Sequence, residues 1–386
     1  KSPERKIGVL GLAFVAFVGI AGGPFGIESA VAAAGPFLTL LGLAILSVFW
    51  AFPQAIMTAE LSTIFDVNGG YIVWVNEGLG RFAGAINAFN SCSSNFLDLP
   101  VYPVLFAGYV GNIFPELTSL ELYFFKLVAL IVVVIVNIYG MDCVALSSFG
   151  FTAFVTLPFV VQLCLVTPKP HVWGEVTPHF DAGLYMGTML WNMQGWDSLG
   201  CFAGEVKDGR KTYPRGVCIA IVMIALTYGV PVAVAVSKDS NYEQWDDGSF
   251  VDVAKLTGKW LGYWMLLAAS VAMLSTLNAM FATTSRALQS VANHKMLPSF
   301  LGVNHASFRT PVAAILLQAV TTAGLMVFDF DVLVVLDTFF NNISLVLEVI
   351  VFLKLKHTEP DRPRPYAVPG GLTGAWLCSI PKFLII

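Results

Sequence analysis

Four acidic residues lie inside long apolar stretches of the sequence, where an ionised side chain is costly. They are Glu28, Asp98, Asp197 and Glu348. A carboxylate near the centre of a bilayer costs about 2.5 to 3.5 kcal/mol on insertion scales. Such residues therefore usually face the interior of a helix bundle and mark the path of a cargo or an ion. These four acids are the first candidates for chemistry in this chain.

The composition requires that membrane helices position these acids. Of the 386 residues, 56% are hydrophobic and only 12% are charged, whereas about a quarter of the residues in a soluble domain are charged. The formal net charge is -4, and the basic residues fall in separate loops, so we expect no nucleic-acid partner. The lipid bilayer is the expected partner of most of the surface.

Eleven segments are long and apolar enough to be membrane helices, each needing about 20 residues to cross a bilayer. We expect them at 7–34, 37–60, 83–113, 122–140, 147–166, 183–203, 216–236, 260–284, 312–328, 332–353 and 372–386. The last segment, 372–386, is interpreted as the truncated start of an eleventh helix. The loops are too short for a soluble domain, so residues 1–386 are expected to form one polytopic, all-α integral membrane domain.

The distribution of Lys and Arg predicts the orientation, because cytoplasmic loops are enriched in these residues. One alternating set of loops holds fifteen of them: Lys1, Arg5, Lys6, Arg81, Lys207, Arg210, Lys211, Arg215, Arg286, Lys295, Arg309, Lys354, Lys356, Arg362 and Arg364. The other set holds five: Lys126, Lys169, Lys238, Lys255 and Lys259. The richer set includes the N-terminus, which is therefore predicted to be cytoplasmic.

Other chemistry-bearing residues show no functional spacing. The six cysteines, which include Cys143, lie in or beside apolar runs, and the five histidines lie in expected loops. We therefore expect neither a disulfide framework nor a metal site. No nucleophile with a base, set of metal ligands or phosphate-binding loop can be assembled, so an enzyme is not expected and no cofactor is implied.

Two of the expected helices are interrupted at corresponding positions. Residues 17–28 contain four glycines and a proline, and residues 191–200 again place glycine and polar residues at mid-depth. Irregular backbone at this depth is tolerated only where it is buried in protein or lines a cavity. The offset of five segments predicts inverted repeats at 7–166 and 183–353, and paired breaks indicate a transporter's binding site. The alternative is two kinks that merely pack against their neighbours.

Several motifs resemble the amino acid-polyamine-organocation (APC) superfamily, nearly end to end. Within it, the chain is similar to the polyamine uptake transporters of plants and protozoan parasites, the polyamine:proton symporter family. The motifs are Gly22-Gly23-Pro24-Phe25-Gly26-Ile27-Glu28, Glu60-Leu61-Ser62, Asn68-Gly69-Gly70-Tyr71 with Trp74, Asp98 with Tyr102-Pro103-Val104-Leu105-Phe106, Trp191-Asn192, Trp196-Asp197-Ser198, Ala203-Gly204-Glu205-Val206-Lys207 with Pro214, Asp247-Gly248, Asp252-Val253-Ala254-Lys255, Arg362-Pro363 and Val368-Pro369. The chain departs from the pattern at Gln194-Gly195, where an Asn-Tyr pair is more usual.

The resemblance implies the five-plus-five inverted-repeat, LeuT-like fold with broken helices 1 and 6. Family members have twelve helices, of which eleven are visible here. It also implies a secondary active transporter at the plasma membrane that takes up polyamines such as putrescine, cadaverine and spermidine with protons by alternating access. The alternatives are a permease or exchanger of cationic or neutral amino acids, and a receptor or scaffold that uses the fold without turnover.

A polyamine site needs separated acceptors for ammonium groups, with apolar or aromatic walls between them. Asp98 and Asp197 suit the ammonium ends, and a desolvated cation over an aromatic face gains about 2 kcal/mol. The alternative for each aromatic residue is packing. The family implies that Trp196 also acts as a lid over the cargo. The expected substrate-binding residues are Gly22, Gly23, Glu28, Asp98, Tyr102, Trp191, Gln194, Trp196 and Asp197.

An amino acid cargo would need donors for its carboxylate, which the half-helix N-terminus and free amides of helix 1 provide in this fold. Pro24 removes one donor and Glu28 adds negative charge, so a carboxylate cargo is disfavoured. For the proton, the titratable candidates are Glu28, Glu60, Glu205 and Glu348. The alternative for Glu60 and Glu205 is to stabilise cytoplasmic helix ends.

The loop from 237 to 259 is rich in acidic residues and is expected on the outer side. It contains Asp239, Glu243, Asp246, Asp247 and Asp252 against three lysines. An acidic vestibule would raise the local concentration of a cation. A solvated loop without such a role is the alternative.

Overall fold

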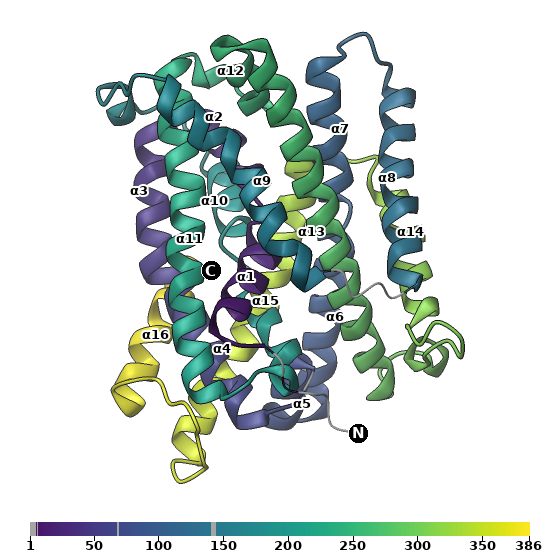
Figure 1. Cartoon of the computed structure of the whole chain (residues 1–386). Coiled ribbons are helices and arrows are strands. Elements are labelled where there is room, and N and C mark those ends of the chain that lie inside the picture. The colour runs from purple at the N-terminus through teal and green to yellow at the C-terminus, as the bar shows by residue number, and fades with distance from the viewer. Residues whose placement is uncertain (1–4, 6, 68, 140–143) are drawn as a thin grey trace.

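A computed structural model describes residue 5 and residues 7–67, 69–139 and 144–386 (Figure 1). Lys1, Lys6, Asn68 and Cys143, on which some of the sequence predictions depend, lie outside these residues. The described residues are helical apart from loops and one isolated parallel bridge between Ile7 and Val206. The helices run roughly alongside one another, with α12 at one end of the bundle and α5 at the other (Figure 1).

Every one of the eleven expected segments coincides with helix. The first part of the chain contains α1 (Val9–Ile20), α2 (Glu28–Ala34), α3 (Pro36–Leu46), the π-helix η1 (Ser47–Ala51), α4 (Phe52–Phe65), α5 (Gly70–Leu79), α6 (Arg81–Asp98), α7 (Val101–Ile113), α8 (Ser119–Tyr139) and α9 (Val144–Leu165). The second part contains η2 (Val172–Gly174), α10 (Ala182–Trp191), η3 (Trp196–Glu205), α11 (Gly209–Lys238), η4 (Tyr242–Gln244), α12 (Ser249–Thr257), α13 (Lys259–Asn293), η5 (Ser299–Gly302), α14 (Val312–Leu325), α15 (Phe330–Thr358) and α16 (Gly371–Ile385).

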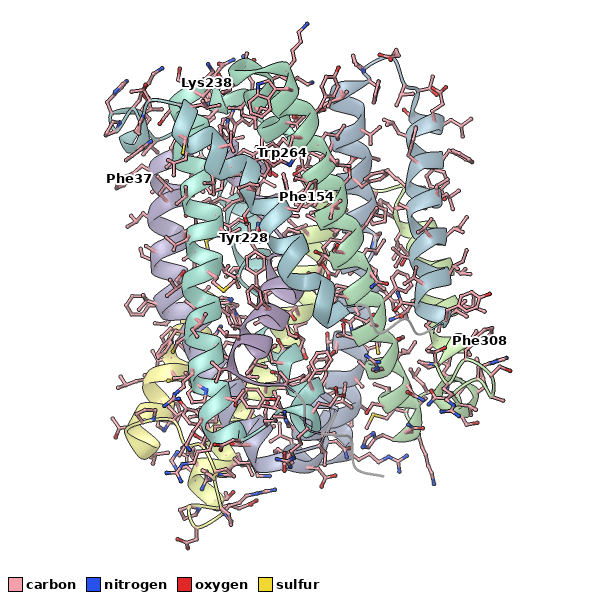
Figure 2. All side chains as sticks on the ribbon, viewed as in Figure 1. Phe37, Phe154, Tyr228, Lys238, Trp264 and Phe308 are labelled. Carbon is pink, nitrogen blue, oxygen red and sulfur yellow. The ribbon has the colours of Figure 1, made fainter. Side chains whose placement is uncertain are left out.

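The helices have the length and polarity of an integral membrane bundle. Six helical stretches in the described residues are long and apolar enough to cross a bilayer, when α3, η1 and α4 are taken as one stretch and α6 and α7 as another: Pro36–Phe65, Arg81–Ile113, Ser119–Tyr139, Gly209–Lys238, Lys259–Asn293 and Phe330–Thr358. α8 exposes large apolar side chains along its length, among them Phe124 and Ile131. Phe37 likewise projects from the edge of the bundle, whereas Tyr228 lies within it (Figure 2). Apolar groups outside and polar groups inside are the arrangement that lipid requires.

Both predicted helix breaks are present. The first segment is helical in α1 and again in α2, and residues 21–27 between them are irregular, with positive φ at Gly22, Gly23 and Gly26. The sixth segment is divided between α10 and η3, with Gly195 in the left-handed region at φ 91°. Glycine adopts this backbone without the steric penalty that a Cβ brings. The backbone therefore leaves the helix at two places inside the bundle.

The two broken segments are joined to each other at two levels. Near the N-terminus, the Ile7 amide donates to the Glu205 carbonyl (3.0 Å), and the Lys207 amide donates to the Ile7 carbonyl (2.9 Å). Deeper in the bundle, the Asn192 side-chain amide donates to the Gly26 carbonyl at 2.9 Å. A Cβ at Gly26 would lie 2.9 Å from the Trp191 ring. The first break therefore packs directly against the end of α10.

The third expected segment, 83–113, is not one regular helix. It divides into α6 and α7 at Pro100, because proline lacks the N–H group that would continue the hydrogen-bond ladder. Asp98 is the last residue of α6 and so lies directly beside this kink. The helix irregularity and the acidic residue thus occur together, as they do in the two broken segments.

Glu60 joins α4 to the C-terminal part of the bundle. Its carboxylate lies 2.8 Å from Lys356 Nζ on α15 and 3.0 Å from Arg364 Nε in the following loop, and it accepts the Val368 amide at 2.6 Å. Glu60 is 1% exposed. Two cations and a backbone amide therefore share one buried carboxylate, which supports the structural alternative for this residue.

We predict that Glu60→Gln lowers the apparent melting temperature of the purified protein. Removing one partner of a buried ion pair costs about 3 to 5 kcal/mol, because the remaining charge stays buried without its counter-ion. Asp66→Asn is the matched control, since the Arg5–Asp66 pair is about half exposed and exposed pairs contribute only about 0 to 1 kcal/mol. Equal melting temperatures for Glu60→Gln and the wild type would contradict the prediction.

Candidate functional site

A cavity lies where the end of α1 and the second helix break face α6, α7, α13 and α15. Its volume is about 70 Å³, several times the roughly 10 to 15 Å³ that one water molecule needs on the same measure. Three carboxylates line it: Asp98, Asp197 and Asp337. The remaining lining is aromatic, apolar or neutral polar, and includes Ile20, Tyr71, Ser94, Tyr102, Trp191, Gln194, Met280, Asn341 and Ser344.

Asp98 is held by two aromatic side chains. Trp191 Nε1 donates to Asp98 Oδ1 at 2.9 Å, and the Tyr102 hydroxyl lies 3.3 and 3.1 Å from the two carboxylate oxygens. The rings of Tyr102 and Trp191 are 6.2 Å apart at their centroids, and Trp191 packs edge-on against Phe330 at 5.5 Å. Asp98 therefore presents negative charge from within an aromatic wall, which is favourable for an organic cation.

Asp337 is a third acid of the cavity that the sequence analysis did not single out. Ser94 Oγ donates to one carboxylate oxygen and Gln194 Nε2 to the other, each at 2.5 Å. Asn341 Nδ2 in turn donates to Gln194 Oε1 at 2.9 Å. Two hydrogen-bond donors stabilise the ionised form of a carboxylate, because that form only accepts hydrogen bonds. Gln194, the departure from the family pattern, thus serves to orient Asp337.

A signal for Asp337 was present in the sequence. It lies in the same apolar segment as Glu348, eleven residues earlier, which is close to three helical turns at 3.6 residues per turn. Asn341 and Ser344 fall between them at spacings of four and three residues. The polar face 337–341–344–348 of α15 would have identified all four residues as pointing toward the bundle interior.

Asp197 lies at the start of η3 and contacts the second expected helix. Gln54 Nε2 on α4 donates to Asp197 Oδ1 at 3.1 Å. Asp197 is buried, as are Asp98 and Asp337. The three acids come from different elements, α6, η3 and α15, so the charge is distributed around the cavity and not confined to one wall.

Glu348 lies beyond the cavity along α15. Ser344 Oγ, which lines the cavity, is 2.8 Å from Ser91 Oγ, 2.6 Å from Asn87 Oδ1 and 3.5 Å from Glu348 Oε1. Glu348 is 1% exposed. A run of polar side chains therefore connects the cavity with a deeply buried carboxylate.

Glu28 binds the free backbone of the first break. Its Oε2 accepts the amides of Gly26 (2.7 Å) and Ile27 (3.0 Å), and its Oε1 accepts the Tyr109 hydroxyl at 2.9 Å. Glu28 is fully buried and does not line the cavity. The protein's own carboxylate thus occupies amides that would otherwise be available to an anionic group.

Aromatic side chains fill the space between the first break and α12. Phe25 packs against Tyr109 (5.2 Å) and Phe159 (5.5 Å), and Phe159 packs against Phe250 on α12 (5.6 Å). Asp247 of the acidic loop is near this cluster, because Ser29 Oγ lies 3.4 Å from its Oδ1. Burial raises the pKa of Asp247 well above its usual value, and the nearby acids, Glu28 foremost, raise it further.

The structure brings together part of the predicted substrate-binding set. Asp98, Tyr102, Trp191, Gln194 and Asp197 line the cavity. Gly22, Gly23 and Glu28 form or bind the first break without lining the cavity, and Trp196 is fully buried with its Nε1 donating to the Met193 carbonyl at 2.9 Å. The lid role of Trp196 therefore stays a prediction. Glu205 lies at the end of η3, partly exposed.

The sequence matches the amino acid permease family profile over residues 7–385. It is 35% identical over 393 residues to polyamine transporter PUT1 of Oryza sativa subsp. japonica, covering all of this chain and 73% of that protein. It is 33% identical to polyamine transporter RMV1 of Arabidopsis thaliana, covering 99% and 79%. A probable agmatine/putrescine antiporter, AguD of Lactococcus lactis, is 21% identical over 89% of this chain and 78% of its own.

We predict that Asp98→Asn, Asp197→Asn and Asp337→Asn each reduce binding of a cationic cargo by about tenfold or more, because a hydrogen bond to a charged group contributes about 1.5 to 3 kcal/mol. Radiolabelled putrescine binding to purified protein measures the effect. Asp361→Asn, at an exposed position in the loop after α15, is the control. An Asp337 variant with wild-type binding would remove this residue from the site.

Proposed function

Since the chain belongs to the amino acid permease family, we propose that it is a secondary transporter that takes up polyamines by alternating access. It is a polytopic integral membrane protein, and its family consists of transporters, not enzymes. The observation that carries the proposal is the cavity between the end of α1 and the second break, where three carboxylates from different elements surround an aromatic and amide-rich space. Putrescine, cadaverine and spermidine carry separated ammonium groups that match such separated acceptors.

The contacts of Glu28 disfavour an amino acid as the cargo. An amino acid transporter of this fold binds the substrate carboxylate at the half-helix N-terminus and the backbone amides of the first break. Here Glu28 Oε2 accepts two of those amides, from Gly26 and Ile27. A second carboxylate at this place would meet a like charge and would lack these donors. Plant relatives named polyamine transporters, at 33–35% identity, support the same cargo.

The proposal includes the arrangement of the chain in the membrane. Residues 7–166 and 183–353 form two inverted repeats, the N-terminus is cytoplasmic, and the protein works in the plasma membrane. The matched breaks in the first and sixth segments support the repeats. The excess of Lys and Arg in one set of loops supports the orientation.

The first experiment measures cargo selectivity in proteoliposomes. We expect saturable uptake of labelled putrescine that excess spermidine or cadaverine inhibits and that excess lysine or arginine does not. Empty liposomes and the Asp98→Asn protein are the controls. Inhibition by lysine at lower concentration than by putrescine would instead identify an amino acid permease. Specific binding without any uptake would identify a receptor.

The second experiment tests for proton coupling, which we propose from the buried glutamates and the polar run that leads to Glu348. Each unit charge that moves across the membrane gains about 2.3 kcal/mol per 100 mV. A membrane potential of about 100 mV, negative inside, therefore accumulates a dication more than about a thousandfold without any coupled ion. The membrane potential must therefore be held at zero with matched potassium and valinomycin. We expect an inward proton gradient to drive accumulation above the outside concentration, and Glu348→Gln to abolish it. No accumulation under these conditions would make the protein a uniporter or exchanger.

A further inference from the structure

A buried lysine lies beside the cavity without lining it. Lys382, on α16, is 1% exposed. Its Nζ is 3.4 Å from the centroid of the Trp50 ring and donates to Gln54 Oε1 at 3.0 Å. Trp50 belongs to the π-helix η1, a local irregularity of the kind that frequently occurs at functional sites. Burying an ammonium group inside the membrane costs free energy, and such residues usually have a function.

One amide connects this ammonium group with the cavity. Gln54 accepts from Lys382 through its oxygen and donates through its nitrogen to Asp197 Oδ1 at 3.1 Å. Lys382 is thereby linked to Asp197, and α16, which carries Lys382, packs against α15, the helix that carries Glu348. Lys382 thus supplies positive charge to one of the three acids of the cavity from the side opposite the cargo.

An unused acceptor lies in the same region. Glu348 Oε2 is buried and has no hydrogen-bond partner among the described residues, while its Oε1 is 3.5 Å from Ser344 Oγ. A buried carboxylate oxygen without a donor is unfavourable. The region around Lys382 therefore holds more acceptor capacity than the single ammonium group of the lysine fills.

The chemistry of the lysine side chain identifies what this region can bind. A lysine side chain is four methylenes ending in ammonium, and putrescine and one end of spermidine present the same aminobutyl group. An aromatic face, an amide oxygen and nearby carboxylates are the groups that such a chain needs. We propose that Trp50, Gln54, Asp197 and Glu348 form an aminobutyl-binding position that Lys382 fills, so that this lysine limits how many ammonium groups the cargo can carry.

The inference rests on the proposed polyamine transport and adds a rule for its selectivity. With Lys382 in place, its positive charge offsets part of the negative charge of Asp197, so the cavity presents net charge for two ammonium groups, which suits a diamine. Without the lysine, Asp197 regains its full negative charge and the region behind Gln54 becomes a further position for ammonium. A cargo with three or four ammonium groups would then gain a contact that a diamine cannot make.

The test compares Lys382→Ala, which empties the position, with the wild type in proteoliposomes. Uptake of labelled putrescine, spermidine and spermine yields kcat/KM for each cargo. We expect the spermidine-to-putrescine ratio to rise about tenfold or more in Lys382→Ala, as for one added charge-assisted contact. Lys382→Arg, which keeps the charge, should retain the wild-type ratio. Lys126→Ala is the matched control, since Lys126 is half-buried on α8 and donates to the Met326 carbonyl.

The outcomes separate this inference from the proposed function. If the wild type transports no polyamine, the proposed function fails and the inference falls with it. If the wild type transports polyamines and the ratio is unchanged in Lys382→Ala, the inference alone is overturned. Lys382→Ser provides a second short neutral variant that also empties the position, and polyamine-induced shifts in melting temperature report binding without turnover. Failure of both neutral variants to fold also counts against the inference, since the ammonium would then hold the bundle together.

Discussion

The need to satisfy buried carboxylates inside a membrane bundle governs the organisation of this protein. No bulk water is present at mid-depth, so every charge and every free amide must find its partner within the protein. Glu28 accepts hydrogen bonds from the amides of the first break. Asp98 accepts hydrogen bonds from Trp191 and Tyr102. Asp337 accepts hydrogen bonds from Ser94 and Gln194. The same contacts that satisfy the acids also determine which helices meet at the centre.

This constraint explains why irregular backbone and acidic residues occur together. Glu28 follows the first break, Asp197 follows the second, and Asp98 stands at the Pro100 kink. A regular helix consumes its own amides and carbonyls, whereas an interrupted one leaves some of them free. At the first break, the carboxylate of Glu28 accepts hydrogen bonds from the amides that the interruption leaves free. The cavity is consequently left with an excess of acceptors, which a cargo rich in donors can satisfy.

Much of the fold could be predicted because its causes are local. The apolar segments, the glycine-rich stretch at 17–28 and the interruption at 191–200 are properties of short sequence windows, and helices or breaks occur at each of them. The position of Asp98 and Asp197 on the cavity could be predicted, because the cost of an acid at membrane depth depends only on residue type and on its surroundings in the sequence. Trp191 and Tyr102 were expected as walls, and they are also the donors to Asp98. Gly22, Gly23 and Glu28 build and satisfy the first break and do not line the cavity, so their role in binding the cargo stays a prediction.

What the sequence by itself determined is the class of molecule: an all-α membrane protein with acids at two broken helices, because hydropathy, proline and glycine act over a few residues. Only the tertiary structure decided which side chains share a cavity. Asp337 joins Asp98 through contacts between α15, α6 and the second break, and Lys382 reaches Asp197 through Gln54, across 328 and 143 residues of chain. Such pairings depend on how helices pack, and no pattern within one helix specifies its partner. The balance of charge around the cavity is therefore a property of the assembled bundle.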